Sequence, residues 1–261
     1  MGEQRPIIIQ GAMELELEEL LRIIKIEREE TINNFKFYFG EIDSYPIILS
    51  LTQIGVVNAC MATMIAIQKF DPLLVINQGV AGAHVDYIHR NDIVVGEKCV
   101  NINAYITSIK NKGEGSNPLE WIFNSRVMEY ATNKELVDIA KKVSYDEHNL
   151  FIGTLGSGDI FNREVDRIEW IHNNKNTLCE DNESIAVYQI CDTFKVKCIG
   201  FRTITNNEYT QAMEDGATIS RLELSKNSNK LLSRTHDEAP ATISQRYTLD
   251  FVKEFLRSIK Q

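Results

Sequence analysis

The sequence predicts a single α/β domain, a three-layer sandwich in which a central mixed β-sheet is flanked by helices. Two observations carry this prediction. Strand-like and helix-like segments alternate along most of the 261 residues. The run 73–76 (LLVI) and similar runs are apolar throughout, as expected for strands that are buried on both faces. No internal repeat is visible, and we expect one domain spanning residues 5–261.

The first half of the chain indicates the order β-α-β-β-α-β-β. Its β-branched and apolar runs predict strands, and its apolar residues at helical spacing predict helices. The expected strands are 6–11, 35–42, 45–51, 73–76 and one that starts at 92–95; the expected helices carry Leu17, Leu20, Leu21 and Ile24, and 56–68. Residues 77–82 (NQGVAG) suggest a turn after the fourth strand. Helix 56–68 is apolar all round, which predicts that it is well buried.

The second half continues the alternation after a looser stretch at 107–130. The expected strands are 151–155 and 196–204, and the expected helices are 133–143, 163–172, 184–194 and 247–259. Residues 209–240 are polar and lack periodicity. We expect a lid, a mobile insertion or a disordered segment there.

The composition excludes several classes of protein. Twenty-eight Lys and Arg against 37 Asp and Glu give a net charge of -9, without a basic block that could follow a phosphate backbone, so nucleic acid is not an expected partner. No apolar run is long enough to span a membrane and no signal peptide is visible, which favours a soluble cytoplasmic protein. The five cysteines are scattered without a C-x-x-C pair, which argues against a disulfide framework or a structural zinc site. We expect neither a metal nor a cofactor.

Polar residues follow several of the expected strands, where α/β folds bind their ligands. Each has an ordinary structural explanation. Glu14 suits the first turn of a helix, Gly79 and Gly82 suit a tight turn, and the acidic run 180–183 suits a helix start. A buried Arg202 needs a carboxylate partner, which a structural ion pair would also provide.

Together, in this order, these segments resemble the nucleoside phosphorylase superfamily, and most closely its bacterial branch that hydrolyses methylthioadenosine and S-adenosylhomocysteine. The matching segments are G-A-M-E at 11–14, Q-I-G-V-V-N-A at 53–59, N-x-G-x-A-G at 77–82, D-I-V-V at 92–95, S-G-D-x-F at 157–161, Glu183 and R-x-I at 202–204. The resemblance implies a nucleoside phosphorylase-like fold, a purine nucleoside as the small-molecule partner, and a homodimer.

The resemblance also implies roles for individual residues in breaking a purine N-glycosidic bond. Cleavage passes through a cationic, oxocarbenium-like ribose that carboxylates stabilise. Glu14 would activate the attacking water, and Arg202 would help to hold that water. Glu183 would accept hydrogen bonds from the ribose hydroxyls. The expected substrate-binding residues also include the turn residues Gly79 and Val80, the purine-stacking Phe161, Asn162, whose backbone groups would read the purine edge, and Asn182.

The chain departs from the family pattern at three positions. Asn182 replaces a methionine and Val80 replaces a serine near the nucleophile. Asn206 stands where the family's hydrolases have the aspartate that protonates purine N7, and an amide cannot deliver a proton. Asn206 can still recognise a 6-oxopurine, and Asp159 and Glu208 are nearby candidate acids.

Three functions therefore remain open at the level of the sequence. A nucleosidase is favoured, because a carboxylate in the first loop would repel phosphate. A phosphorylase acting on 6-oxopurine nucleosides is the second possibility. A nucleoside-binding protein with little or no turnover is the third.

Overall fold

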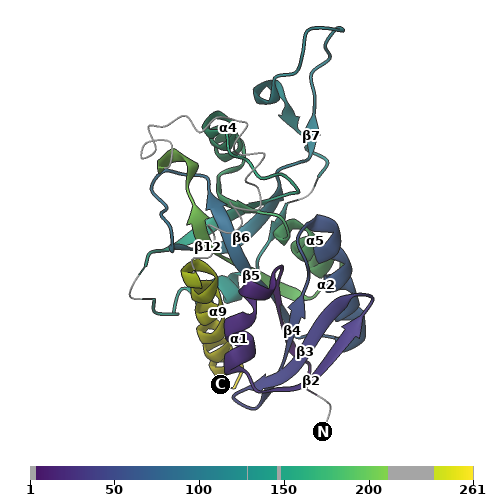
Figure 1. Ribbon diagram of the computed structural model, residues 1–261, viewed down its shortest axis with the longest axis vertical. Helices are drawn as coiled ribbons and strands as arrows, with labels where there is room; N and C mark the ends of the chain where they lie inside the picture. The colour runs from purple at the N-terminus through teal and green to yellow at the C-terminus, as the bar shows by residue number, and fades with distance from the viewer. Residues whose placement is uncertain (1–3, 128, 146–147, 211–237, 261) are drawn as a thin grey trace.

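A computed structural model describes residues 4–127, 129–145, 148–210 and 238–260, and it contains one central mixed β-sheet (Figure 1). The ten strands of this sheet lie in the order β11-β10-β6-β12-β5-β1-β4-β3-β2, with β9 paired to β6. Their bounds are β1 Ile7–Gly11, β2 Ile26–Ile32, β3 Phe35–Ile42, β4 Tyr45–Leu51, β5 Leu74–Ala83, β6 Ile93–Asn101, β9 Tyr130–Ala131, β10 Leu150–Ser157, β11 Thr177–Asp181 and β12 Lys197–Asn206.

Helices cover both faces of the sheet, as the alternating pattern predicts. They are α1 Glu18–Ile23, α2 Val56–Phe70, α3 Lys134–Ala140, α4 Val165–Lys175, α5 Ser184–Phe194 and α9 Glu238–Ile259, with short 3-10 turns at Glu14–Glu16 and Pro118–Glu120. Figure 1 shows α1 and α9 on one side of the sheet and α2 and α5 on the other. Alternate residues of β1 enter the two cores: Ile7 and Ile9 pack on the α1/α9 side, and Ile8 packs on the α2/α5 side.

Five neighbouring strands of the sheet, β11, β10, β6, β12 and β5, form a closed ring, because the first and the last of them also pair with each other. β11 is parallel to β10 and also forms a short antiparallel pairing with β5, with Cys179 opposite Ala83 and Glu180 opposite Gly82. The closure brings the end of β11 next to the ends of β5 and β12, because Asn206 of β12 is also opposite Gly82. Residues from three distant parts of the chain therefore meet at one edge.

The structure differs from the sequence-based expectations in several elements, four of which bear on the site and its surroundings. Residues 77–82 do not form a turn, because β5 continues to Ala83. Strands β2 and β11 form where no strand was expected, and Glu180 and Asp181 belong to the end of β11 rather than to a helix start. Helix α2 is exposed along one side, at Val57, Met61 and Met64, so the prediction of burial all round is wrong.

Two further regions frame the sheet. A two-stranded arm, β7 (Tyr105–Ile106) with β8 (Ile122–Phe123), projects from the body of the molecule (Figure 1). Of the expected polar insertion at 209–240, residues 209–210 are helical and 238–240 begin α9. The remainder of that expectation, at 211–237, lies outside the described residues.

Candidate active site

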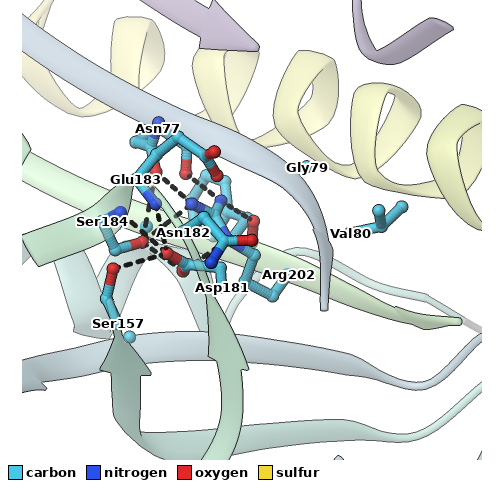
Figure 2. A network of polar contacts seen from close by, with 12 residues as sticks. Asn77, Gly79, Val80, Ser157, Asp181, Asn182, Glu183, Ser184 and Arg202 are labelled. Atoms are coloured by element: carbon cyan, nitrogen blue, oxygen red, sulfur yellow. Dashed lines mark hydrogen bonds and ion pairs between the residues drawn. The ribbon is translucent and has the colours of Figure 1, made fainter. Parts of the chain in front are cut away.

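Arg202 lies at the centre of a buried polar network (Figure 2). Its side chain is enclosed between β5, β12 and the start of α5, and only 1% of the residue is exposed. Nε donates to Asp181, Nη1 donates to the carbonyls of Asn77 and Phe201, and Nη2 donates to the side chains of Asn77 and Ser184. All five N–H groups are therefore bonded within the protein, and none remains to hold a water molecule.

Asp181 is the carboxylate that neutralises Arg202. Its Oδ2 lies 2.8 Å from Arg202 Nε, and its Oδ1 accepts from the Ser157 hydroxyl and from the backbone N–H groups of Glu183 and Ser184. Burial alone would raise the pKa of Asp181, yet the Arg202 charge and the hydrogen bonds from Ser184 and Ser157 hold it below its usual value. Asp181 is thus a fixed anion that orients the first turn of α5.

Glu14 does not reach this network. Its side chain is 82% exposed, and its nearest charged partner is Lys36, whose Nζ lies 3.9 Å from Glu14 Oε1. The 3-10 turn Glu14–Glu16 directs the first of its glutamates to solvent and the last one inward. The structure therefore does not bring Glu14 together with Arg202, and it places Glu16 there instead.

Glu16 is a buried carboxylate at the end of the 3-10 turn that follows β1, only 4% exposed. Its Oε2 accepts from the N–H groups of Ala12 and Met13 at 2.7 and 3.1 Å, and its Oε1 accepts from Val80 N–H at 3.0 Å. Burial raises its pKa, while the Arg202 charge and these backbone N–H groups oppose the rise. Oε1 keeps one lone pair that no described group occupies, which suits a base for water.

Gly79 and Val80 serve Glu16 through the backbone of β5. A Cβ at Gly79 would lie 2.4 Å from Glu16 Oε1, so only glycine leaves room for the carboxylate. Gly79 N–H donates to Ser244 of α9, and Val80 N–H donates to Glu16. The contact that Val80 provides is therefore independent of its side chain.

Glu183 lies at the start of α5 and is also nearly buried. Its Oε1 accepts from Gly55 N–H at 2.9 Å, just before α2. Burial and the neighbouring carboxylates of Asp181 and Glu16 raise the pKa of Glu183 to about 8. Three acids thus surround one arginine, an arrangement that favours an additional positive charge.

The loop after β10 carries Phe161, which is 55% exposed. The residue that follows it is fixed: Asn162 donates from its backbone N and from Nδ2 to Glu180, at 2.7 and 2.6 Å. The Asn162 N–H that was expected to read the purine edge is therefore engaged within the protein. Asn182 is half-buried and donates from Nδ2 to the carbonyl of Gly158.

Asn206 ends β12 with its amide oriented by two neighbours. Its Nδ2 donates to Glu208 Oε1 at 3.1 Å, and its Oδ1 accepts from the Thr205 hydroxyl at 2.8 Å. Glu208 forms a bidentate ion pair with Arg163, at 3.0 and 3.1 Å, so both of its carboxyl oxygens already accept hydrogen bonds within the protein. Asp159 accepts from Val56 N–H at the start of α2. Neither candidate acid is placed as a proton donor.

Sequence reasoning missed Glu16 because both glutamates suit the helical pattern. Glu14 lies three residues before Leu17 and Glu16 lies four residues before Leu20, so each falls on an apolar face. Only the tight 3-10 turn decides between them.

The described residues also contain no group of three or more His, Cys, Asp and Glu side chains arranged to hold a metal ion. No helix within these ranges is both long and apolar enough to cross a membrane.

Comparisons with known proteins place this geometry in a family. The family model described as "Phosphorylase superfamily" matches residues 6–236. A 5'-methylthioadenosine/S-adenosylhomocysteine nucleosidase of Buchnera aphidicola is 31% identical over 229 residues, which cover 86% of this chain and 94% of that protein. Another protein of that name, from Staphylococcus carnosus, is 32% identical over 198 residues, covering 75% and 84%.

Solved structures share the fold. A nucleosidase of that name from Helicobacter pylori superposes with a TM-score of 0.76 at 24% identity, covering 97% of this chain and 100% of that one. The futalosine hydrolase of Helicobacter pylori gives a TM-score of 0.75 at 24% identity, covering 96% and 98%. The expected nucleoside phosphorylase-like fold is confirmed, and the chain belongs to the phosphorylase superfamily.

Proposed function

We propose that this chain is a purine nucleosidase that hydrolyses the N-glycosidic bond of a purine nucleoside or 5'-thionucleoside. The observation that carries the proposal is the buried carboxylate of Glu16, placed beside Arg202 and Glu183. The relatives named 5'-methylthioadenosine/S-adenosylhomocysteine nucleosidase support the same substrate class.

In the proposed reaction, water attacks the anomeric carbon as the bond to the purine breaks. Glu16 Oε1 accepts the proton that the water loses, and the purine leaves with the bonding electron pair and is protonated by solvent. Glu183, once ionised, accepts hydrogen bonds from the ribose hydroxyls, and its charge stabilises the cationic sugar. Phe161 stacks on the purine, and Asn206 donates a hydrogen bond to it.

The surroundings of Glu16 favour water over phosphate as the nucleophile. A phosphate needs several N–H donors below the sugar. Arg202 has none free, and Val80 N–H is bonded to Glu16. Glu16 and Glu183 would repel an anion there.

The experiment measures free base released from inosine, adenosine and methylthioadenosine, each with and without phosphate. We expect release in phosphate-free buffer, at a rate that phosphate does not raise. Release that strictly requires phosphate would instead identify a phosphorylase.

Asn206 supports a second candidate, a nucleoside-binding protein with weak turnover. Its amide is held by Glu208 and Thr205 and has no proton to transfer to the leaving base. Calorimetry that detects tight nucleoside binding, together with no product after prolonged incubation, would favour this candidate.

A homodimer is the assembly that the exposed apolar residues support. Val57, Met61 and Met64 form one stripe along α2 at helical spacing, and Ile54 lies just before the helix; each is at least 37% exposed. The arm exposes four further apolar side chains: Ile106, Ile109, Leu119 and Ile122. A second copy of this chain, as the family resemblance implies, would cover these residues.

Sedimentation of the full chain tests the dimer. We expect the wild type to sediment as a dimer and Met61→Glu to sediment as a monomer, because a charge in an apolar interface is costly. Ile23→Glu is the matched control, since Ile23 is also exposed (47%) but lies on α1, on the opposite side of the sheet. A monomeric wild type would contradict the proposal.

We infer a cytoplasmic location, in which the protein acts without a cofactor. All five cysteines are free, and four of them are buried, as suits a reducing compartment.

A further inference from the structure

A buried polar cluster that the proposed chemistry does not use is bonded to the loop that carries Phe161. It consists of Glu180 at the end of β11, His84 just after β5, and Asn162. Their exposed fractions are 5%, 0% and 8%. Buried polar groups are costly unless they are bonded, so such a cluster needs a structural or functional reason.

Every member of the cluster is bonded to another. Glu180 Oε1 accepts from Asn162 N, and Glu180 Oε2 accepts from Asn162 Nδ2. Oε2 also lies 3.0 Å from His84 Nε2, and His84 Nδ1 lies 2.7 Å from the Thr177 hydroxyl. The hydrogen bonds are all satisfied when Glu180 is a carboxylate, His84 donates from Nε2, and Thr177 donates to Nδ1. Thr177 thus orients His84, and His84 orients Glu180.

A second anchor holds the next residue of the same loop. Arg163 binds Glu208 through a bidentate ion pair, and Glu208 also accepts from Asn206. Phe161 is therefore followed by two residues that are each tied to an acid at the end of a different strand, Glu180 in β11 and Glu208 just after β12. Its own ring stays half exposed.

The sheet places the Glu180 cluster beside the amide of Asn206. Glu180 and Asn206 are both opposite Gly82 of β5, one from each side, so their side chains lie on the same face of the sheet. Gly82 has no side chain between them, and a Cβ there would approach Asn206 Nδ2 to 3.1 Å. A change in the hydrogen bonds of the Glu180 cluster would thus alter the surroundings of Asn206, at the edge of the sheet where the purine is proposed to bind.

We propose that Glu180, oriented by His84, is a positioning residue that fixes Asn162 and thereby holds the ring of Phe161 over the purine subsite. The proposal rests on the proposed function for the identity of the ligand. Glu180 acts through Asn162 and does not itself touch the reacting atoms. Its effect is therefore on nucleoside affinity rather than on the chemical step.

The test compares Glu180→Gln with the wild-type full chain. A glutamine side chain keeps the size but offers one acceptor oxygen in place of two, so one of the two Asn162 bonds is lost. We expect KM for the nucleoside to rise about tenfold and kcat to change less than about threefold. Amide hydrogen exchange at residues 158–164 should quicken at least about tenfold.

Two further variants make the test specific. Thr177→Val removes only the hydroxyl that orients His84. We expect a smaller rise in KM and a smaller increase in the exchange rate at 158–164 than in Glu180→Gln. If Glu180→Gln does not fold, Thr177→Val tests the proposal in its place. Glu30→Gln on the outer strand β2 is the control for the loss of one carboxylate, and it should match the wild type.

The outcomes separate this proposal from the proposed function. Unchanged KM and unchanged exchange at 158–164 in both variants would overturn the positioning role. A fall in kcat with KM constant would also overturn it, because Glu180 would then act in the transition state. If the wild type releases no base, the proposed function fails, while hydrogen exchange and calorimetric nucleoside affinity still decide whether Glu180 positions the loop.

Discussion

Arg202 is bonded only within the protein, so in the proposed reaction it would act on the substrate through its charge rather than through contact. Its five N–H groups are all bonded to Asp181, Asn77, Phe201 and Ser184. A guanidinium held this way keeps its position while a cation forms nearby, and it leaves Glu16 as the group that can accept a proton. The excess of acids over bases around it explains how such a buried site can favour a cationic ribose.

Glu16→Gln should separate the two glutamates of the first loop. The amide cannot accept a proton from water, so we expect base release to fall by about 10²-fold or more, the usual size of general-base catalysis. Glu14→Gln is the matched control and should keep nearly all activity, because Glu14 is exposed to solvent. Equal losses in both variants, measured as kcat/KM, would contradict this assignment.

The pH dependence of nucleoside binding should report Glu183. Its pKa of about 8 means that the free protein holds this carboxyl mostly protonated at pH 6 to 7, whereas the ribose hydroxyls need an ionised acceptor. We expect the Kd of a non-hydrolysable nucleoside analogue to fall as pH rises toward 8, by at most about tenfold per pH unit, and then to level off. Calorimetry from pH 6 to 9 tests this expectation, and Glu183→Gln should flatten the curve. A wild-type Kd that is constant over this range would rule it out.

At the scale of residues, the sequence predicted which residues belong to the candidate site better than it predicted the contacts that they make. Glu183 lies close to Arg202 and Asp181, whereas the printed contacts of the Asn206 amide are to Thr205 and Glu208. The contacts of Arg202, by contrast, depend on Asp181, whose place on β11 required a strand that the sequence did not indicate. Glu14 and Glu16 are the first and last residues of the same 3-10 turn, which directs one to solvent and the other inward, and residue spacing cannot distinguish the two.

At the scale of elements, β5 explains why glycines occur in the middle of a strand. Gly79 and Gly82 suggested a turn from the sequence, yet both lie in extended backbone that passes close to side chains, Glu16 and Asn206 respectively. A glycine required by close approach and a glycine required by a turn look the same in one sequence. The sequence therefore predicted the start of β5 and not its extent.

Gly79→Ala tests the close approach directly. Its Cβ would lie 2.4 Å from Glu16 Oε1, so the carboxylate must move and lose its bond to Val80 N–H. We expect a loss of about 1–3 kcal/mol in the free energy of unfolding, together with a large drop in base release. Urea unfolding and the base-release assay measure the two effects. Gly82→Ala, whose Cβ meets the terminal amide of Asn206 at 3.1 Å, is the milder control; an equal effect of both variants would contradict the role of Gly79.

The missed strands have a common physical cause. β2 is an edge strand with most of its charged residues in solvent, so it lacks the apolar run that marks a buried strand. β11 is only five residues long and ends in the acids that face Arg202 and Asn162. Its strand character comes from pairing with β10 and β5, which is a long-range property. The long apolar strands and the alternation with helices needed no such information.

At the scale of the whole molecule, the acidic network couples the site to stability. Glu16 and Glu183 both have raised pKa values, and Asp181 has a lowered one. The first two groups keep their protons in the folded state over a pH range where the unfolded chain has lost them. Asp181 instead loses its proton more readily in the folded state than in the unfolded chain, so its contribution to the free energy of unfolding is lost only in acid.

These signs predict that the free energy of unfolding is greatest at mildly acidic pH. Between the unfolded value of 4.5 and the folded value of about 8, the folded state binds the Glu183 proton and the unfolded state does not. Stability should therefore decrease as pH rises through this window, by about 1.4 kcal/mol per pH unit from this one group. Below the unfolded Asp value of 3.8, stability should fall again as pH approaches the lower folded pKa of Asp181.

Urea unfolding at pH 5, 6, 7 and 8 measures the alkaline slope. Glu183→Gln has no proton to lose and should reduce that slope, leaving the part that Glu16 contributes with the same sign. Glu14→Gln, which replaces an exposed carboxylate in the same region, should keep the wild-type slope. If wild type and Glu183→Gln have parallel pH profiles, Glu183 does not retain its proton in the folded protein. Any pH dependence of the nucleoside Kd would then have to come from another titrating group.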